Sequence, residues 1–222
     1  MSAFTLHIGN RNYSSWSFRG WLACRLGGID FEENLIRLDQ PDTAANIAAI
    51  SPNRRVPCLV HGNVRVWDSL AIAEYLNELQ PNAAMWPEAP AQRAMARSLA
   101  AEMHSGFTGI RNRCPMDIRG RIEPIAPPAE VAQDLARLEE AWAQPRRAFG
   151  TADPYLFGRW TLADVFFAPV ASRCRTYGLS LSPAAAAYVD AVLEHADVRE
   201  WTDAALREPW RIPHEDAAEQ RF

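Results

Sequence analysis

The chain has 222 residues, of which 48% are hydrophobic, 23% charged and 10% aromatic, a composition that supports a sizeable core and excludes an intrinsically disordered chain. Its formal net charge of −4 gives no bulk attraction to nucleic acid or to an anionic membrane surface, so neither is expected as a partner. No apolar stretch approaches the roughly 20 residues that a membrane-spanning helix needs.

Strands and helices are predicted to alternate over the first 80 residues. Polar and apolar residues alternate at 4–9, which predicts a strand, and apolar residues three and four apart predict a helix at 15–26 that ends at Gly27 and Gly28. A second strand at 31–39 then implies a right-handed crossover and a parallel pair. The elements expected next are a helix at 42–50, a strand after Pro57, a turn at 61–63 that makes a hairpin with a strand at 64–67, and an amphipathic helix at 68–79.

Beyond residue 80 the pattern becomes helical. A run with three prolines predicts a linker at 81–91. Thr161 and Asp164 fit a capping box, which we interpret as structural. The fold class is therefore α/β plus all-α, with a small α/β domain at 1–80 and a C-terminal helical-bundle domain at 92–222. Its helices are predicted at 91–112, 129–144, 162–177, 184–195 and 198–207.

The cysteine spacing argues against a disulfide framework and against a metal centre. Cys24, Cys58, Cys114 and Cys174 are scattered, without a CxxC pair or a histidine at metal-ligand spacing. The first residues also lack the charged and apolar pattern of a signal peptide. We therefore expect reduced, mostly buried thiols, no metal, and a cytoplasmic location.

Four motifs, in this order, resemble those of the cytosolic glutathione S-transferases. They are YSSWSFRGWLA at 13–23, RVPCLV at 55–60, WDSLAIAEYL at 67–76 and WTLADVFFAPV at 160–170. The first is most similar to the serine-type helix start of zeta-like and theta-like bacterial members, whose zeta run is Ser-Ser-Cys-Ser. The resemblance implies a thioredoxin-like N-terminal domain that binds glutathione, a helical domain that contributes the electrophile site, and a two-fold homodimer.

Ser14 and Ser15 stand where a serine commonly caps a helix by accepting a backbone N–H. The resemblance implies a catalytic role as well, in which a hydroxyl donates to the glutathione sulfur and favours the thiolate over the thiol, whose ordinary pKa is ~8.5. A hydrogen bond to a charged group contributes about 1.5–3 kcal/mol, which corresponds to about one to two pKa units. Position in the motif places Ser14 first and Ser15 second, whereas Ser17 is expected to be structural. This run stands where a thioredoxin-like redox protein carries CxxC, so dithiol chemistry is excluded at this place.

The resemblance also implies a set of glutathione contacts. Val56 would pair its backbone with the cysteinyl unit, ahead of a cis bond to Pro57, and Ser69 would hold the γ-glutamyl carboxylate while Asp68 takes the ammonium. Without the resemblance, Pro57 merely opens a strand, and Asp68 or Ser69 merely caps a helix. The whole set is Trp16, Arg55, Val56, Pro57, Asp68 and Ser69.

The electrophile site is expected along residues 103–121 of the helical domain. The four arginines at 111–121 favour an anionic acceptor, although the same segment also fits a solvated or dimer-facing helix surface. The candidates are Tyr13, His104, Phe107 and Arg111, with Arg113 as a further one.

Three functions follow from these residues. The leading hypothesis is a glutathione transferase whose thiolate attacks a small apolar electrophile. A glutathione-dependent cis–trans isomerase of the maleylacetoacetate type is the alternative, weakened because Trp16 stands where the zeta run has cysteine. A non-enzymatic binding module on the same scaffold is a third hypothesis, which the intact serines, Val-Pro and Asp-Ser oppose.

Overall fold

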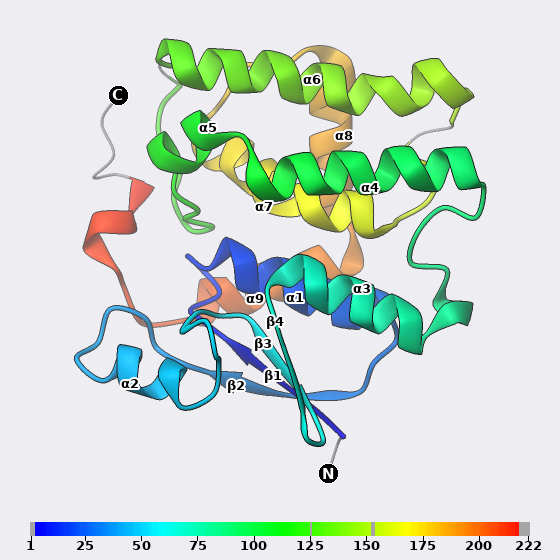
Figure 1. Ribbon diagram of the computed structural model, residues 1–222. Coiled ribbons are helices and arrows are strands. Elements are labelled where there is room, and N and C mark those ends of the chain that lie inside the picture. The colour runs from blue at the N-terminus through cyan, green and yellow to red at the C-terminus, as the bar shows by residue number, and fades with distance from the viewer. Residues whose placement is uncertain (1–2, 125, 152–153, 218–222) are drawn as a thin grey trace.

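The computed structural model describes residues 3–124, 126–151 and 154–217. A mixed α/β domain and a helical domain lie one above the other (Figure 1), and this confirms the predicted fold class. The predicted domains at 1–80 and 92–222 also take in residues 1–2, 125, 152–153 and 218–222, which lie outside the described residues.

The N-terminal domain is built on a four-stranded sheet in the order β2-β1-β3-β4. β1 and β2 are parallel, and both other neighbouring pairs are antiparallel, so the predicted crossover and hairpin are confirmed. The predicted strand at 31–39 is too long, because the chain leaves the sheet after Leu35 and Asp39 takes a positive φ of 59°. The elements are β1 Phe4–Ile8, α1 Ser15–Leu26, β2 Phe31–Leu35, α2 Thr43–Ala48, β3 Cys58–His61, β4 Val64–Trp67 and α3 Ser69–Leu79.

All the regular elements that the structure describes in the C-terminal domain are helices. The predicted helix at 91–112 is two helices, because Gly106 is extended and Phe107 takes a left-handed φ of 57° between them. The predicted end at 144 is also wrong, since α6 continues through Pro145. The elements are η1 Pro81–Ala83, α4 Pro90–Ser105, α5 Thr108–Arg113, α6 Ala129–Phe149, α7 Leu162–Thr176, α8 Pro183–Glu194, α9 Ala196–Arg207 and η2 Pro213–Glu215.

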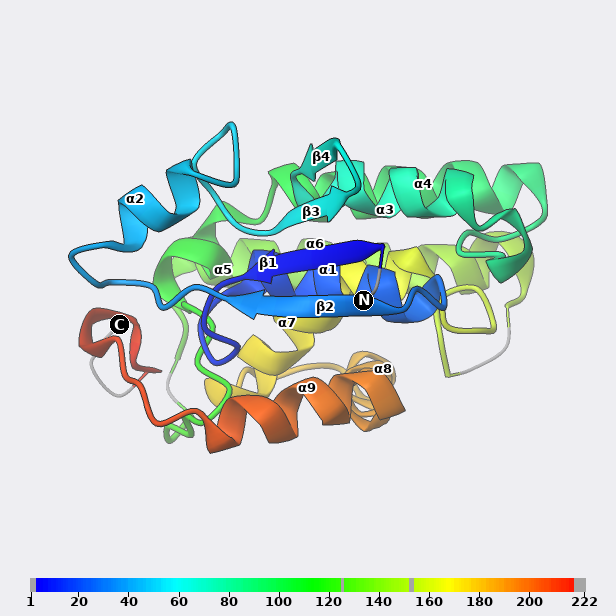
Figure 2. The same ribbon diagram turned by 90° about the horizontal axis from the view of Figure 1, so that it is seen from below.

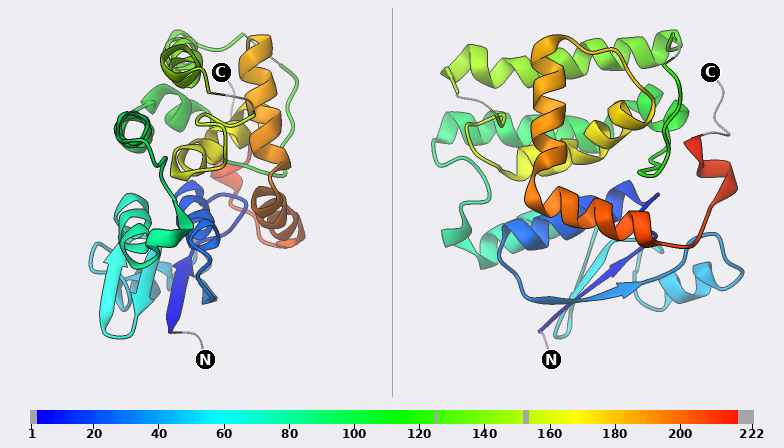
Figure 3. Two further views of the ribbon diagram at one scale, coloured as in Figure 1. Left: turned by 90° about the vertical axis from the view of Figure 1, so that its right-hand side faces the viewer. Right: turned by 180° about the vertical axis from the view of Figure 1, so that it is seen from behind.

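Helix α1 lies at the seam between the two domains. It packs against α3 within its own domain and against α7 and α9 of the other. Seen from below and from the end, the sheet covers one side of α1 and the helical domain the other (Figures 2 and 3). Nine of its twelve residues are buried, and these include polar residues that lie outside its apolar positions. The start of α1 therefore opens where both domains can contribute side chains.

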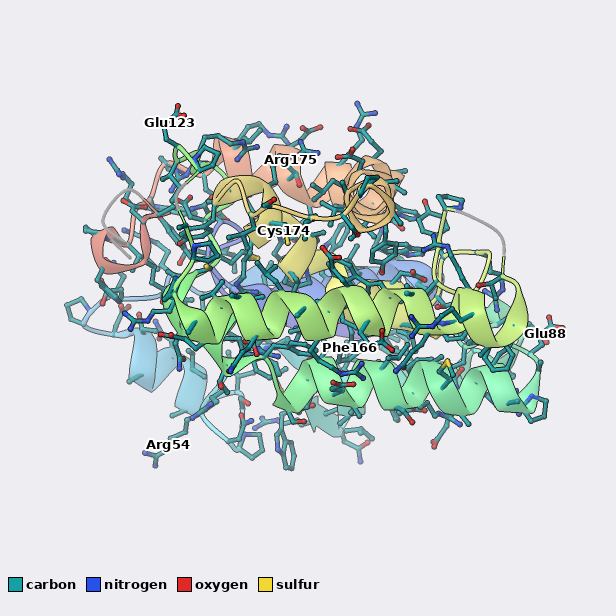
Figure 4. The ribbon with its side chains drawn as sticks, turned by 90° about the horizontal axis from the view of Figure 1, so that it is seen from above. Arg54, Glu88, Glu123, Phe166, Cys174 and Arg175 are labelled. Atoms are coloured by element: carbon teal, nitrogen blue, oxygen red, sulfur yellow. The ribbon has the colours of Figure 1, made fainter. Side chains whose placement is uncertain are left out.

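Helix α7 forms the centre of the helical domain. Figure 4 shows Phe166 and Cys174 among the packed helices, whereas Arg54 and Glu88 lie at the edge. The capping box at its start is confirmed: the Asp164 carboxylate accepts the backbone N–H of Thr161 at 2.9 Å and that of Leu156 at 3.1 Å. Burial raises the pKa of Asp164 to about 6.

The four cysteines are buried free thiols, as predicted. Among the described helices, none is both long and apolar enough to cross a membrane.

Candidate active site

Residues 10–14, here called the serine turn, connect β1 to α1. Ser14 is the N-cap of α1, and its Oγ accepts the backbone N–H of Ser17 at 3.4 Å. The hydroxyls of Ser14 and Ser17 lie 2.7 Å apart, and Ser17 Oγ accepts the backbone N–H of Gly9 at 3.0 Å. Hydroxyl hydrogens rotate to suit their partners. In the structure Ser14 donates to Ser17 Oγ; when the Ser17 hydroxyl rotates to donate instead, the Ser14 proton is left for a group in front of the helix.

Two adjoining cavities open at the start of α1, and Trp16, Arg55 and Val56 line both. The first has a volume of about 240 Å³, and all six predicted glutathione contacts line it. The second, of about 500 Å³, is lined by both Ser14 and Ser15. The structure thus brings three separate sequence motifs to one place.

The first cavity ends at the start of α3. The peptide bond between Val56 and Pro57 is cis. Asp68 caps α3: its Oδ1 accepts the backbone N–H of Leu70 at 2.8 Å, and its Oδ2 lies 3.2 Å from His104 Nε2. Burial acts to raise the pKa of Asp68, but the hydrogen bonds from His104 and from the backbone together have the larger effect and hold this pKa below its ordinary value. The carboxylate is therefore charged at neutral pH.

Ser69 presents a polar atom with no partner in this cavity. Its hydroxyl is buried and makes no hydrogen bond to any described residue. Such a buried polar group is costly unless something satisfies it. A ligand group that bonds to Ser69 would supply the missing partner.

His104 lies beside the first cavity rather than the second. Its ring meets Trp16 edge-on at a centroid distance of 4.9 Å, while its Nε2 faces Asp68. Its Nδ1 is buried and, among the described residues, has no partner. The sequence placed His104 in the electrophile site, but its contacts associate it with the predicted glutathione site.

Three guanidinium groups surround the start of α1, of which those of Arg19 and Arg173 are buried and that of Arg111 is half-buried. Arg19 and Arg111 lie over the Trp16 ring, 5.1 and 5.0 Å from its centroid, and Arg173 of α7 donates to Ser15 Oγ at 3.3 Å. No described carboxylate forms an ion pair with any of the three, and the outer nitrogens Nη1 and Nη2 of Arg19 and Nη1 of Arg173 are unpartnered within the same residues. Burial, together with the neighbouring charge of Arg111, lowers the pKa of Arg173 to about 10, so it is still charged at pH 7. This cluster favours an anion, and the sequence predicted only Arg111 of its members.

The other predicted electrophile-site residues are placed differently. Tyr13 lines the second cavity, but its hydroxyl donates to Asp216 at 2.5 Å and accepts from Arg119 at 2.9 Å. Phe107 is 6% exposed in the core and lines neither cavity. Arg113 pairs with Glu130 on the surface. Arg119 and Arg121 donate to backbone carbonyls, as Arg111 does to that of Gly106, and of the arginine cluster Arg111 alone lines the second cavity.

Comparisons with known proteins agree with this geometry. The sequence model described as "Glutathione S-transferase, N-terminal domain" matches residues 13–79, and that of the C-terminal domain matches 128–205. The maleylacetoacetate isomerase of Rattus norvegicus is 30% identical over 77% of this chain and 78% of its own. The glutathione S-transferase Z2 of Arabidopsis thaliana is 33% identical over 70% of each chain. A solved glutathione transferase homologue from Burkholderia with bound glutathione superposes with a TM-score of 0.68 at 25% identity, covering 91% of this chain and 97% of the other.

Proposed function

The chain belongs to the glutathione S-transferase family, and we propose that it binds glutathione in the first cavity and directs its thiolate at an anionic acceptor in the second. The observation that carries this proposal is the junction of the two cavities. Ser14 and Ser15 line the second cavity, while Trp16, Arg55 and Val56 form a wall common to both.

The described contacts suggest how glutathione lies. Its γ-glutamyl end would satisfy the unpartnered Ser69 hydroxyl, with the charged Asp68 carboxylate available for the ammonium. The Val56 backbone would pair with the cysteinyl unit. The sulfur would then reach Ser14, where a hydroxyl hydrogen bond, the positive end of α1 and the nearby Arg173 charge all favour the thiolate.

The acceptor differs from the small apolar electrophile that the motifs alone suggest. Arg111 and Arg173 line the second cavity and form no ion pair with a described carboxylate, although Glu215 lines the same cavity and its charge interacts with that of Arg173. A carboxylate of the acceptor would compensate the buried charge of Arg173 and the half-buried charge of Arg111, whereas a wholly apolar acceptor would leave both without an ion pair. We therefore infer an acceptor that carries at least one carboxylate.

Glutathione-dependent cis–trans isomerisation is the second candidate, and the guanidinium cluster favours it. In that reaction the thiolate adds to an activated double bond, the resulting single bond rotates, and elimination restores the double bond and the thiolate. Charge that develops on the substrate would be stabilised by Arg111 and Arg173. The named activity of the rat relative is of this kind. Trp16 stands where the zeta run has cysteine, but this difference removes neither the serines nor the guanidinium groups that the reaction would use.

The test combines binding with turnover. The protein should be retained on immobilised glutathione and should convert a maleyl-type dicarboxylate faster than the neutral electrophile 1-chloro-2,4-dinitrobenzene. Glutathione consumed in step with product indicates conjugation, and glutathione regenerated indicates isomerisation. Binding without turnover of either acceptor would support the non-enzymatic module.

Asp68→Ala and Ser69→Ala are each expected to raise the KM for glutathione about tenfold, which corresponds to ~1.4 kcal/mol, with kcat nearly unchanged. Both groups line the first cavity, which Ser14 does not line, so their contacts are expected to be equal in the ground and transition states. Steady-state kinetics at varied glutathione concentration make the measurement. A fall in kcat with an unchanged KM would show that the γ-glutamyl end lies elsewhere.

A homodimer is expected in solution. Val64 and Trp67 of β4 are each 41% exposed, and Leu79 at the end of α3 is 40% exposed, so apolar side chains are uncovered at both of these elements of the N-terminal domain. Light scattering at micromolar concentration should give about twice the chain mass of 24.9 kDa. A single species of one chain mass would refute the dimer.

A cytoplasmic location is part of the proposal. Glutathione must be a reduced thiol to react, and the chain's own cysteines are free thiols. Both conditions suit a reducing compartment.

A further inference from the structure

The serine turn is held by a segment from the far end of the chain, residues 208–217, here called the C-terminal segment. The two carboxylate oxygens of Glu208 accept consecutive backbone N–H groups of the turn, that of Arg11 at 2.8 Å and that of Asn12 at 3.3 Å. Glu208 is 6% exposed, so these bonds are shielded from water. The backbone N–H groups of Tyr13 and Ser14, in contrast, bond within the turn to the carbonyl of Asn10.

Further contacts attach the same turn to the C-terminal segment and to the loop that follows α5. The Tyr13 hydroxyl donates to Asp216 at 2.5 Å and accepts the backbone N–H of Ile212 at 3.1 Å. The Asn12 side chain donates to Asp117 at 2.8 Å and accepts the backbone N–H of Arg119 at 2.9 Å. The turn that ends at Ser14 is therefore fixed from outside its own domain.

Among these contacts, the pair of hydrogen bonds to Glu208 is the hardest for another side chain to replace. A buried backbone N–H without an acceptor is costly, and one side chain satisfies two of them in adjacent residues. The Arg11 guanidinium lies near this carboxylate, with Nη1 3.6 Å from Oε1, but it pairs more closely with Glu33, so it balances the charge of Glu208 only in part. A neutral side chain with a single acceptor cannot reproduce this pattern.

We propose that Glu208 is a positioning residue for Ser14: by fixing the backbone of Arg11 and Asn12, it sets the place of the Ser14 hydroxyl at the junction of the two cavities. This inference rests on the proposed function, in which Ser14 activates the glutathione thiol. It assigns to the C-terminal segment a role in the geometry of the N-terminal site. Because the same segment supplies His214 and Glu215 to the wall of the second cavity, one element contacts both the turn and the acceptor side.

Glu208→Gln is the principal test. Glutamine has one carbonyl oxygen, which can accept only one of the two backbone N–H groups. Its NH2 group then faces the other backbone N–H, so one hydrogen bond is lost and two donors oppose each other. We expect the pKa of bound glutathione, read from thiolate absorbance against pH, to rise by about one unit. At pH 7 kcat should fall about tenfold, while the calorimetric Kd for glutathione changes less than about threefold, because the tripeptide is bound mainly in the first cavity.

Two variants separate positioning from folding. Asp164→Asn is the matched control, since Asp164 is also buried and accepts two backbone N–H groups, but at the start of α7. It should lower Tm and leave the thiolate pKa unchanged. Glu208→Asp keeps both carboxylate oxygens, one methylene further back, and should give a shift smaller than that of glutamine; it also serves as the test if Glu208→Gln does not fold.

The outcomes are distinct. A lowered Tm in Glu208→Gln or Glu208→Asp with wild-type thiolate pKa and kcat would overturn the positioning role and leave the proposed function standing. Wild-type protein that binds glutathione without lowering the pKa of its thiol would overturn the proposed function, and the positioning role with it. A pKa shift in the Glu208 variants and none in Asp164→Asn supports the inference.

Discussion

Arg173→Gln is expected to lower kcat/KM for a dicarboxylate acceptor by about a hundredfold, because removing one partner of a buried, hydrogen-bonded charge pair costs about 2–5 kcal/mol. Arg173 reaches the second cavity from α7, and its Nη1 is buried without a partner among the described residues. Activity toward a neutral electrophile should fall much less, by about threefold, because there Arg173 contributes only its charge near the thiolate. Steady-state kinetics with one charged and one neutral acceptor give the comparison.

The loss of activity in Arg173→Gln should not be accompanied by a loss of thermal stability. Arg173 is a buried charge near the like charge of Arg111, and such a group opposes folding. Glutamine can still donate to the carbonyl of Cys114, which Arg173 contacts at 2.7 Å. We therefore expect an unchanged or raised Tm together with the loss of activity.

Arg175→Gln is the control, two residues further along α7. Arg175 is exposed and pairs with Asp190 at 3.1 Å on the surface. The same substitution there should affect neither acceptor. An equal loss toward the charged and the neutral acceptor in Arg173→Gln would show that Arg173 shapes the cavity rather than binding a carboxylate.

The neighbouring arginines 173 and 175 also show where sequence reasoning ends. Both arginines lie in the same predicted helix, and nothing in the local sequence distinguishes them. In the structure, Arg173 is buried and Arg175 is exposed, because α7 packs against α1. Arg19 presents the same difficulty. Its position three residues after Trp16 places it on the same face of a helix, but only the tertiary contact with α7 removes it from water.

The first cavity was predictable because its residues occupy contiguous motifs. Trp16 belongs to the helix start, Arg55 to Pro57 form one tripeptide, and Asp68 and Ser69 are adjacent, so each group carries its own local signal. The second cavity combines parts of the first two motifs, at 13–16 and 55–56, with scattered residues of α5, the loop after it, α7 and the C-terminal segment. No local pattern joins them, which explains why Phe107 was expected there and Arg173 was not.

Helix boundaries show a related limit. A glycine inside a periodic run costs a helix only ~1 kcal/mol, so Gly106 did not predict a break. The left-handed φ of Phe107 that separates α4 from α5 depends on its burial in the core.

Ser14→Ala is expected to keep glutathione binding but to raise the pKa of the bound thiol by about one to two units. The reason is the loss of a hydroxyl that donates to the sulfur, worth about 1.5–3 kcal/mol to the thiolate. A higher pKa leaves less thiolate at pH 7, so turnover there should fall and recover as the pH rises through the new pKa. Ultraviolet absorbance of the bound thiolate against pH gives the measurement.

The N-cap role of Ser14 requires its own control. Ser14 Oγ accepts the backbone N–H of Ser17 at 3.4 Å, and Ser182 caps α8 with the same 3.4 Å contact to Ala185. Loss of either cap should cost about 1 kcal/mol of stability. Ser182→Ala should therefore match the lower Tm of Ser14→Ala without any shift in the thiolate pKa.

Ser15→Ala tests which hydroxyl acts on the sulfur. Ser15 Oγ accepts from Arg173 at 3.3 Å, so its loss should alter the thiolate pKa less than the loss of Ser14. If Ser15→Ala moves the midpoint and Ser14→Ala does not, the two roles are exchanged. If neither moves it, both serines are structural, and the donor must be another group at the junction of the cavities. Because Asp216 already accepts the Tyr13 hydroxyl, the indole N–H of Trp16 would then be the group to replace next.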